Sequence, residues 1–225
     1  MCSENSDPSL PSTAARRPLK TRGHAWANGL ALWLARKRVA PNLISLMSLV
    51  FALIGGFAFL AIPGTEGGGR PGLFVLAAVC IQLRLLCNLL DGMVAVEGGL
   101  GSRSGEIYNE LPDRIADPLL IVPAGYATDF AFGPELGWTA GLLAVMTAYI
   151  RVLGASTGLA QDFCGPMAKP HRMAVLTVAA LVAAALAAAN LGGIVLAIGL
   201  VVIAAGALLT AARRTRAIVR ALEAR

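Results

Sequence analysis

Acidic and amide side chains recur at helical spacing in two neighbouring stretches of the chain. The first, "NLLDGMVA", places Asn88 and Asp91 three residues apart, and the second, "GEIYNELPDRIAD", places Asn109 and Asp113 four residues apart. Residues three or four apart lie on one face of a helix. We therefore expect two helices that each carry a stripe of oxygen-bearing side chains, joined by a short glycine-rich loop.

The residue types in these stripes indicate a site for divalent cations. Clustered carboxylates repel one another unless cations lie among them. Hard ions such as Mg²⁺ bind carboxylate and amide oxygens, and they usually share substrate phosphates as further ligands. Glycines near the stripes, Gly92 and Gly105 among them, would let a phosphate-bearing ligand approach the backbone closely.

These polar stretches lie in a chain whose composition is typical of a membrane protein. Hydrophobic residues make up 56% of it and charged residues only 14%, against roughly 45–50% apolar in ordinary globular proteins. An ionisable residue inside a membrane span marks a functional site by default, because burying it in lipid is costly. The competing interpretation is a structural ion network, for example Asp117 with Arg84 and Glu110 with Arg114.

The fold class is predicted to be all-α, a polytopic membrane protein of six transmembrane helices. A span needs about 20 mostly apolar residues. The expected spans cover residues 43–62, 73–90, 107 to about 127, 137 to about 154, 173–191 and 194–211. Basic residues gather in short cytoplasmic loops, and fifteen of the nineteen would lie on one side of this arrangement. We therefore expect a multi-pass protein of the cell inner membrane with both termini in the cytoplasm.

The amino-terminal region is expected to have two parts. Residues 1–22 are polar and rich in Ser and Pro, which predicts a disordered leader. Residues 23–225 then form the membrane-embedded domain. At its start, "HAWANGLALWLARKRV" combines Trp26 and Trp33 with a basic cluster. This composition favours an amphipathic helix lying in the membrane interface, with a plain juxtamembrane linker as the alternative.

The stretch from Asn88 to Asp113 resembles the signature of the CDP-alcohol phosphatidyltransferases, D-x2-D-G-x2-A-R-x8-G-x3-D-x3-D. Five of its eight defined positions agree with intact spacing, namely Asp91, Gly92, Ala95, Gly105 and Asp113. At the other three, Asn88, Val96 and Asn109 stand where the signature has Asp, Arg and Asp. The resemblance covers most of the chain from about residue 24 onward.

This resemblance implies transfer of a phosphatidyl group from a CDP-alcohol, such as CDP-diacylglycerol, to a small acceptor alcohol with release of CMP. It implies that the acidic positions hold two Mg²⁺ or Mn²⁺ ions, and that Asp113 also acts as general base while Asp91 bridges the ions. Asn88 and Asn109 would coordinate through amide oxygens with lower affinity, or one ion would be absent. Gly92, Ala95 and Gly105 are expected to contribute to the binding site.

Three basic residues outside the signature are candidates for binding a phosphate group. Arg151 lies near the end of the fourth expected span, and Lys169 and Arg172 lie at the start of the fifth. In the family, basic residues in similar places receive a phosphate of the acceptor, so the resemblance indicates a phosphorylated acceptor. Anchoring at the cytoplasmic surface explains Lys169 and Arg172 equally well, and Arg151 could extend to the interface.

The sequence leaves two other functions open. One is a catalytically inactive scaffold that binds CDP-lipid, an interpretation favoured by the two amides at acidic positions. The other is a small ion-coupled transporter that uses its intramembrane carboxylates. Membrane lipids and, by resemblance, a second copy of the chain are the further partners expected; no nucleic-acid partner is.

Overall fold

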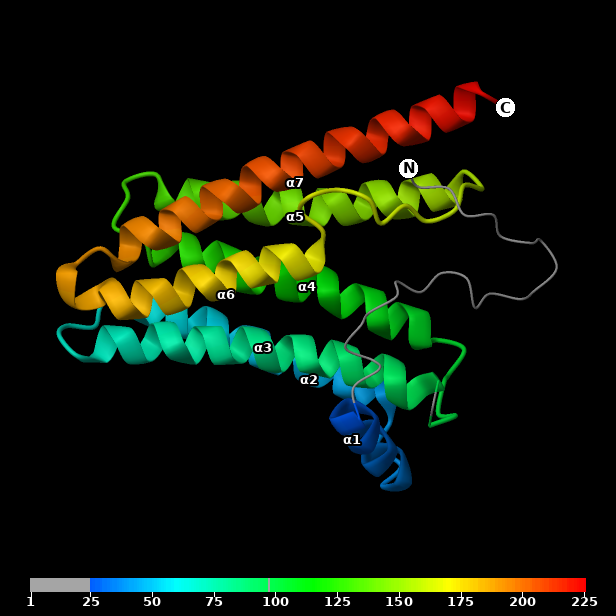
Figure 1. The fold of residues 1–225 in the computed structure, drawn as a ribbon, viewed down its shortest axis with the longest axis horizontal. Coiled ribbons are helices and arrows are strands. Elements are labelled where there is room, and N and C mark those ends of the chain that lie inside the picture. Colours follow the sequence, from blue (N-terminus) through cyan, green and yellow to red (C-terminus); the bar gives the residue numbers. More distant parts are fainter. Residues whose placement is uncertain (1–24, 97) are drawn as a thin grey trace.

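The protein was analysed as a computed structural model that describes residues 25–96 and 98–225. The predicted leader lies outside the described residues. In the described part the chain folds entirely into helices (Figure 1): α1 Ala25–Arg36, α2 Pro41–Ala61, α3 Gly69–Val96, α4 Gly105–Tyr126, α5 Gly133–Ser156, α6 Lys169–Leu186, the 3-10 turn η2 Ala187–Ala189, and α7 Gly192–Glu223. The all-α prediction is confirmed.

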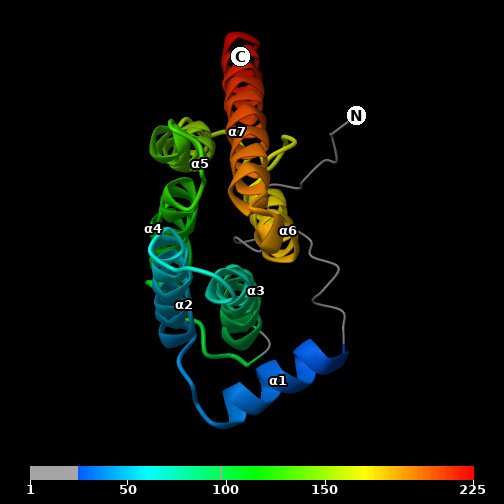
Figure 2. The ribbon, with the colours of Figure 1, turned by 90° about the vertical axis from the view of Figure 1, so that its left-hand side faces the viewer.

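Helices α2 to α7 form a closed ring. The extensive contacts run from α3 to α2, then to α4, α5, α7 and α6, and back to α3. Figure 2 shows this ring close to end-on, with α1 crossing below it. The sequence predicts α3 and α4 as adjacent antiparallel helices, but their direct contact is slight. They face one another across the interior of the ring, so their polar stripes border a shared space instead of a packed seam.

Helix α2 separates α3 from α4, and small residues let it do so. A side chain at Gly55 would collide with Leu120 of α4 and crowd Cys80 of α3, and one at Gly56 would meet the backbone of α4 at Leu119. Close backbone approach of this kind is how helices associate in lipid, where no hydrophobic force drives them together. The glycine pair of α2 thus fixes the separation of the two polar helices.

Large apolar side chains on the ring point outward. Phe57 of α2, Leu142 of α5 and Ile198 of α7 are each at least 60% exposed. The buried faces are rich in alanine, as in α5, whose buried residues include Ala140, Ala144 and Ala148. An apolar exterior around a small-residue interior is expected when lipid is the surrounding solvent.

Within the described residues, five helices are long and apolar enough to cross a membrane, namely α2, α3, α5, α6 and α7. The predicted third span is the 22-residue helix α4, which completes the ring. The first half of α4 carries too many charged residues for this helix to be counted with the other five as an apolar span. The count of six membrane crossings therefore stays a prediction.

Two helices continue well past the predicted ends of their spans. Helix α3 continues to Val96, beyond the predicted span end at residue 90, so Asp91 and Ala95 lie on the same helix as Asn88, as their spacing predicts. Helix α7 continues to Glu223, well past the predicted end at residue 211, and Figure 1 shows it projecting beyond the other helices. A helix can leave the apolar layer without ending, so hydropathy marks the limit of the span and not of the helix.

Candidate active site

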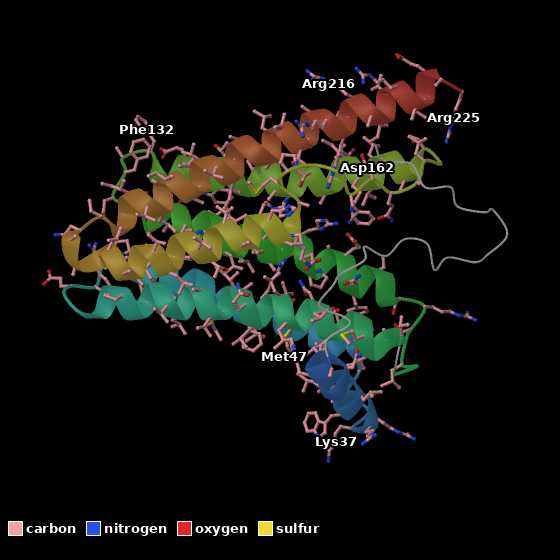
Figure 3. All side chains as sticks on the ribbon, in the orientation of Figure 1. Lys37, Met47, Phe132, Asp162, Arg216 and Arg225 are labelled. Atoms are coloured by element: carbon pink, nitrogen blue, oxygen red, sulfur yellow. The ribbon has the colours of Figure 1, made fainter. Side chains whose placement is uncertain are left out.

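A cavity of about 550 Å³ opens inside one end of the ring. It is bordered by α2 to α7 and by the connections that precede α4 and α6. In Figure 3, Asp162 marks the α5–α6 connection on this side, while Phe132 lies at the opposite end of α5. All ten residues singled out from the sequence line this cavity: Asn88, Asp91, Gly92, Ala95, Gly105, Asn109, Asp113, Arg151, Lys169 and Arg172.

Asp91 is held on the α2–α3 side by neutral donors. The Ser45 hydroxyl donates to Asp91 Oδ2 at 2.6 Å, and the Gly92 backbone N–H donates to Oδ1 at 2.6 Å. Among the described residues Asp91 forms no ion pair. Asp91 is 3% exposed, so a buried carboxylate faces the cavity without an ion-pair partner among the described residues.

Asp113 lies on α4 opposite Asp91 and is surrounded by donors. Asn88 Nδ2 donates to Asp113 Oδ1 at 2.7 Å, and Arg84 Nη2 lies 3.2 Å from the same oxygen. Lys169 pairs with Asp113 Oδ2. The sequence predicts Asn88 as an oxygen ligand of a metal ion. In the structure its amide nitrogen also contacts Asp113, the carboxylate that the family resemblance implies as general base.

A buried ion network continues from Asp113 through Arg84 and Asp117 to Arg172, which also lines the cavity. Arg84 Nη2 lies 2.6 Å from Asp117 Oδ1, and Arg172 Nη2 lies 2.7 Å from Asp117 Oδ2. Arg172 Nη1 also donates to Thr147 Oγ1 and to the Met167 carbonyl, each at 3.0 Å. The pairing of Asp117 with Arg84 considered from the sequence is present. Both terminal nitrogens of Arg172 are engaged by the protein, which disfavours this residue as a phosphate ligand.

Arg151 occupies the side of the cavity formed by α5. Its Nη2 lies 2.6 Å from Glu110 Oε2, and its Nη1 donates to Gln161 Oε1 at 2.8 Å. The guanidinium also lies over the ring of Phe163, 4.9 Å from its centroid. Glu110 pairs with Arg114 as well, the contact expected from their spacing of four.

Several cavity residues were missed by sequence reasoning, namely Asn42, Ser45, Thr147, Gln161, Phe163 and Arg214. Arg214 lies beyond the predicted end of the last span at residue 211, on the continued helix α7, and donates to the Thr147 carbonyl at 2.7 Å. Its position on a helix that extends past the apolar run was the available signal. Ser45 gave none, because one serine in an apolar helix is compatible with many roles.

The oxygen donors of the cavity suit a hard divalent cation. The described residues contain no group of three or more His, Cys, Asp or Glu side chains placed to hold a metal. The candidate ligands are instead two carboxylates, Asp91 and Asp113, with the amides of Asn88 and Asn109. Asp91, buried and without a protein cation, is the donor that fits such an ion best, because a buried carboxylate needs a counter-charge. Glu97 and the side chain of Glu106 lie outside the described residues.

Comparison with known proteins places this architecture among the membrane-embedded enzymes that act on CDP-linked alcohols. The family model for CDP-alcohol phosphatidyltransferase matches residues 38–212. The chain belongs to this family and is a multi-pass membrane protein.

Two curated relatives are similar over about two thirds of the chain. The inner membrane protein YnbA of Escherichia coli is 29% identical over 144 residues, which cover 62% of this chain and 66% of the relative. The phosphatidylinositol phosphate synthase of Mycolicibacterium smegmatis is 28% identical over 152 residues, 64% of this chain and 63% of the relative. The matched region thus spans slightly less than two thirds of each relative's own length.

Solved structures share the fold. The Mycobacterium tuberculosis phosphatidylinositol phosphate synthase in complex with manganese and citrate has a TM-score of 0.69 at 18% identity, covering 85% of this chain and 88% of that one. The same enzyme with CDP-DAG bound has a TM-score of 0.68 at 19% identity, covering 85% and 92%.

Proposed function

We propose that the protein transfers a phosphatidyl group from a CDP-alcohol, with CDP-diacylglycerol as the donor, to a small acceptor alcohol. The observation that carries this proposal is that Asp91, Asp113 and the spaced glycines of the signature all line a single cavity. The family supports the reaction class. The relative crystallised with CDP-DAG supports the donor.

The reaction exchanges a phosphoanhydride bond for a phosphoester bond. The acceptor hydroxyl oxygen bonds to the lipid-side phosphorus, the bond from that phosphorus to the CMP oxygen breaks, and CMP leaves with the electron pair. Asp113 accepts the hydroxyl proton, as a positioned general base does. Asp91 and Asp113, with Asn88 and Asn109, are proposed to hold Mg²⁺ or Mn²⁺, which neutralises pyrophosphate charge and stabilises the leaving group. The manganese in the tuberculosis enzyme supports this choice of ion.

The acceptor is proposed to carry a phosphate group. Five basic and three acidic side chains line the cavity in the described part of the chain, so its walls favour anions. Arg151, Lys169 and Arg214 are proposed to receive this phosphate. All of them have protein partners, as Arg172 does, but Arg172 is held in a buried pair with Asp117, whereas the partner of Arg151, Glu110, is partly exposed and shared with Arg114. The name of the mycobacterial relative, a phosphatidylinositol phosphate synthase, is consistent with such an acceptor.

We further propose that the protein resides in the inner membrane with both termini in the cytoplasm, as a homodimer. The name of the Escherichia coli relative supports the membrane. Lys37 and Arg225 lie toward the cavity end of the ring in Figure 3, and basic residues favour the cytoplasmic side. The dimer rests on the family resemblance.

One assay tests the proposed reaction. The purified full chain is incubated with CDP-diacylglycerol, Mg²⁺ or Mn²⁺, and matched acceptors with and without phosphate, such as glycerol 3-phosphate and glycerol. Release of CMP with a phosphorylated acceptor is the expected result. Binding of CDP-diacylglycerol without CMP release from any acceptor would instead favour the inactive scaffold, for which the amides at positions 88 and 109 are the structural argument. Absence of both binding and release would favour the transporter class.

A further inference from the structure

Five charged residues form a chain of alternating sign across the interior of the ring. In order they are Lys169, Asp113, Arg84, Asp117 and Arg172, joined by four ion pairs. Their helices are α6, α4, α3, α4 and α6, so the chain links the two polar helices that α2 holds apart. Of these five residues, the proposed reaction uses only Asp113 and Lys169.

Arg84 is the shared member of the network, and it is shared unequally. Its Nη2 lies 2.6 Å from Asp117 Oδ1 and 3.2 Å from Asp113 Oδ1. The side chain is fully buried, at 0% exposure, so water does not compete for it. The shorter contact is the stronger one at such burial. The ion pair of Arg84 with Asp117 is therefore stronger than its ion pair with Asp113.

Asp117 is itself fixed in place from both sides. Its second oxygen receives Arg172 at 2.7 Å, and Arg172 is anchored on Thr147 of α5 and the Met167 carbonyl. Asp117 is only 4% exposed and does not line the cavity. Its effect on the reacting atoms therefore passes through its two partners, Arg84 and Arg172, of which Arg84 contacts Asp113.

We propose that Asp117 is a positioning residue that limits the pairing of Arg84 with Asp113 and so keeps Asp113 more available to a divalent cation. The role of Asp113 in this proposal rests on the proposed function. The physical basis is competition between two acids for one buried guanidinium. When Asp117 is ionised, the closer contact of Arg84 Nη2 lies one helical turn beyond Asp113.

Neutralising Asp117 should transfer Arg84 to Asp113. In Asp117→Asn the five-residue network gains one net positive charge, and among the described residues Asp113 is the acid that remains paired with Arg84. A guanidinium paired fully with Asp113 competes with a divalent ion for the same oxygens. The additional change Arg84→Gln removes the competitor and restores the original net charge of the network.

Mn²⁺ binding to the purified full-length protein, followed by electron paramagnetic resonance, tests this proposal without requiring turnover. Asp117→Asn is expected to weaken Mn²⁺ binding roughly 10- to 100-fold, the range seen when groups that orient metal ligands are removed. The double variant Asp117→Asn with Arg84→Gln should bind Mn²⁺ within about threefold of the wild type, because the charge is restored. Asp129→Asn is the matched control, since Asp129 pairs with Arg70 at the opposite end of the ring.

The rescue distinguishes positioning from a structural role. If Asp117 only stabilised the fold, removing both buried partners would not restore Mn²⁺ binding. Unchanged binding in Asp117→Asn, failed rescue in a folded double variant, or no Mn²⁺ binding by the wild type would each overturn the proposal. If thermal unfolding shows that Asp117→Asn does not fold, the single variant Arg84→Gln tests the proposal. Weaker Mn²⁺ binding by Arg84→Gln would contradict competition between Arg84 and the ion for Asp113. A wild type that shows this binding pattern but releases no CMP would refute the proposed function and leave this inference standing.

Discussion

The two sides of the cavity differ in charge. The side formed by α2 and α3 presents Asn42, Ser45, Asn88, Asp91 and Val96 and no basic residue. The side formed by α4 to α7 presents all five basic residues of the lining: Arg114, Arg151, Lys169, Arg172 and Arg214. Among the described residues, the side formed by α2 and α3 therefore has no basic side chain of its own beside Asp91, whereas the side formed by α4 to α7 has five.

This difference is sharpened by Val96, which stands where the family signature has arginine. It is 58% exposed and lines the cavity, so the α3 side lacks a basic group that the signature would place there. We interpret the neutral side as the place of the metal-bound donor and the basic side as the place of an anionic acceptor. The following variants test this division in order of expected effect.

The largest effect is expected where the two sides meet, at Asp113. Asp113→Asn should lower kcat by about 10²–10⁴-fold, the usual contribution of a general base. Binding of CDP-diacylglycerol should change little, because the fold and the α3 side are retained. CMP release and equilibrium binding of the donor measure the two quantities. The control is Asp129→Asn at the opposite end of the ring, and retained turnover in Asp113→Asn would exclude the assigned base.

On the basic side, Arg151→Ala should raise the KM for a phosphorylated acceptor roughly 10- to 100-fold, since a hydrogen bond to a charged group contributes about 1.5–3 kcal/mol. The KM for the donor should stay within about twofold, because Arg151 lies across the cavity from Asp91. Steady-state kinetics with each substrate varied in turn measures this difference. Arg216→Ala, on the exposed face of α7, is the control. An equal rise in both KM values would contradict the separation of the sides.

On the neutral side, restoring the acids of the signature should strengthen metal binding. The double variant Asn88→Asp with Asn109→Asp is expected to lower the dissociation constant for Mn²⁺ about tenfold, because charged oxygen ligands bind hard cations more tightly than amides. Isothermal titration calorimetry gives both affinity and stoichiometry. Asn190→Asp, at the turn between α6 and α7, controls for added charge. Unchanged Mn²⁺ affinity would mean that the family signature does not describe this site.

The smallest effect is expected from making the two sides more alike. Val96→Arg should tighten CDP-diacylglycerol binding by a few-fold, about 1 kcal/mol, since a partly exposed cation gains little from a phosphate in water. The acceptor KM should not change. Donor binding measured at two salt concentrations checks the electrostatic origin, with Val219→Arg on the exposed part of α7 as control. Weaker donor binding would indicate that position 96 does not face the donor.

The fold was predictable from the sequence to the extent that local pattern decides it. Apolar runs located the helices, and the proline at position 41 marked the start of α2. The charged first half of α4 shows the limit, because composition alone does not say whether a polar helix crosses the membrane or only completes a ring. The continuation of α7 past residue 211 was missed for a related reason, since polar helical sequence resembles polar tail.

For the site, helical spacing determined which side chains share a face on α3 and on α4, because 3.6 residues per turn is a property of the chain itself. All ten residues selected in this way line one cavity. Only the tertiary structure decided that α3 and α4 lie across the ring from one another, and that Ser45 and Arg214 join them. It also decided that Arg84 pairs with both Asp113 and Asp117. Those contacts join residues far apart in sequence, so they depend on how closely small residues let the helices pack.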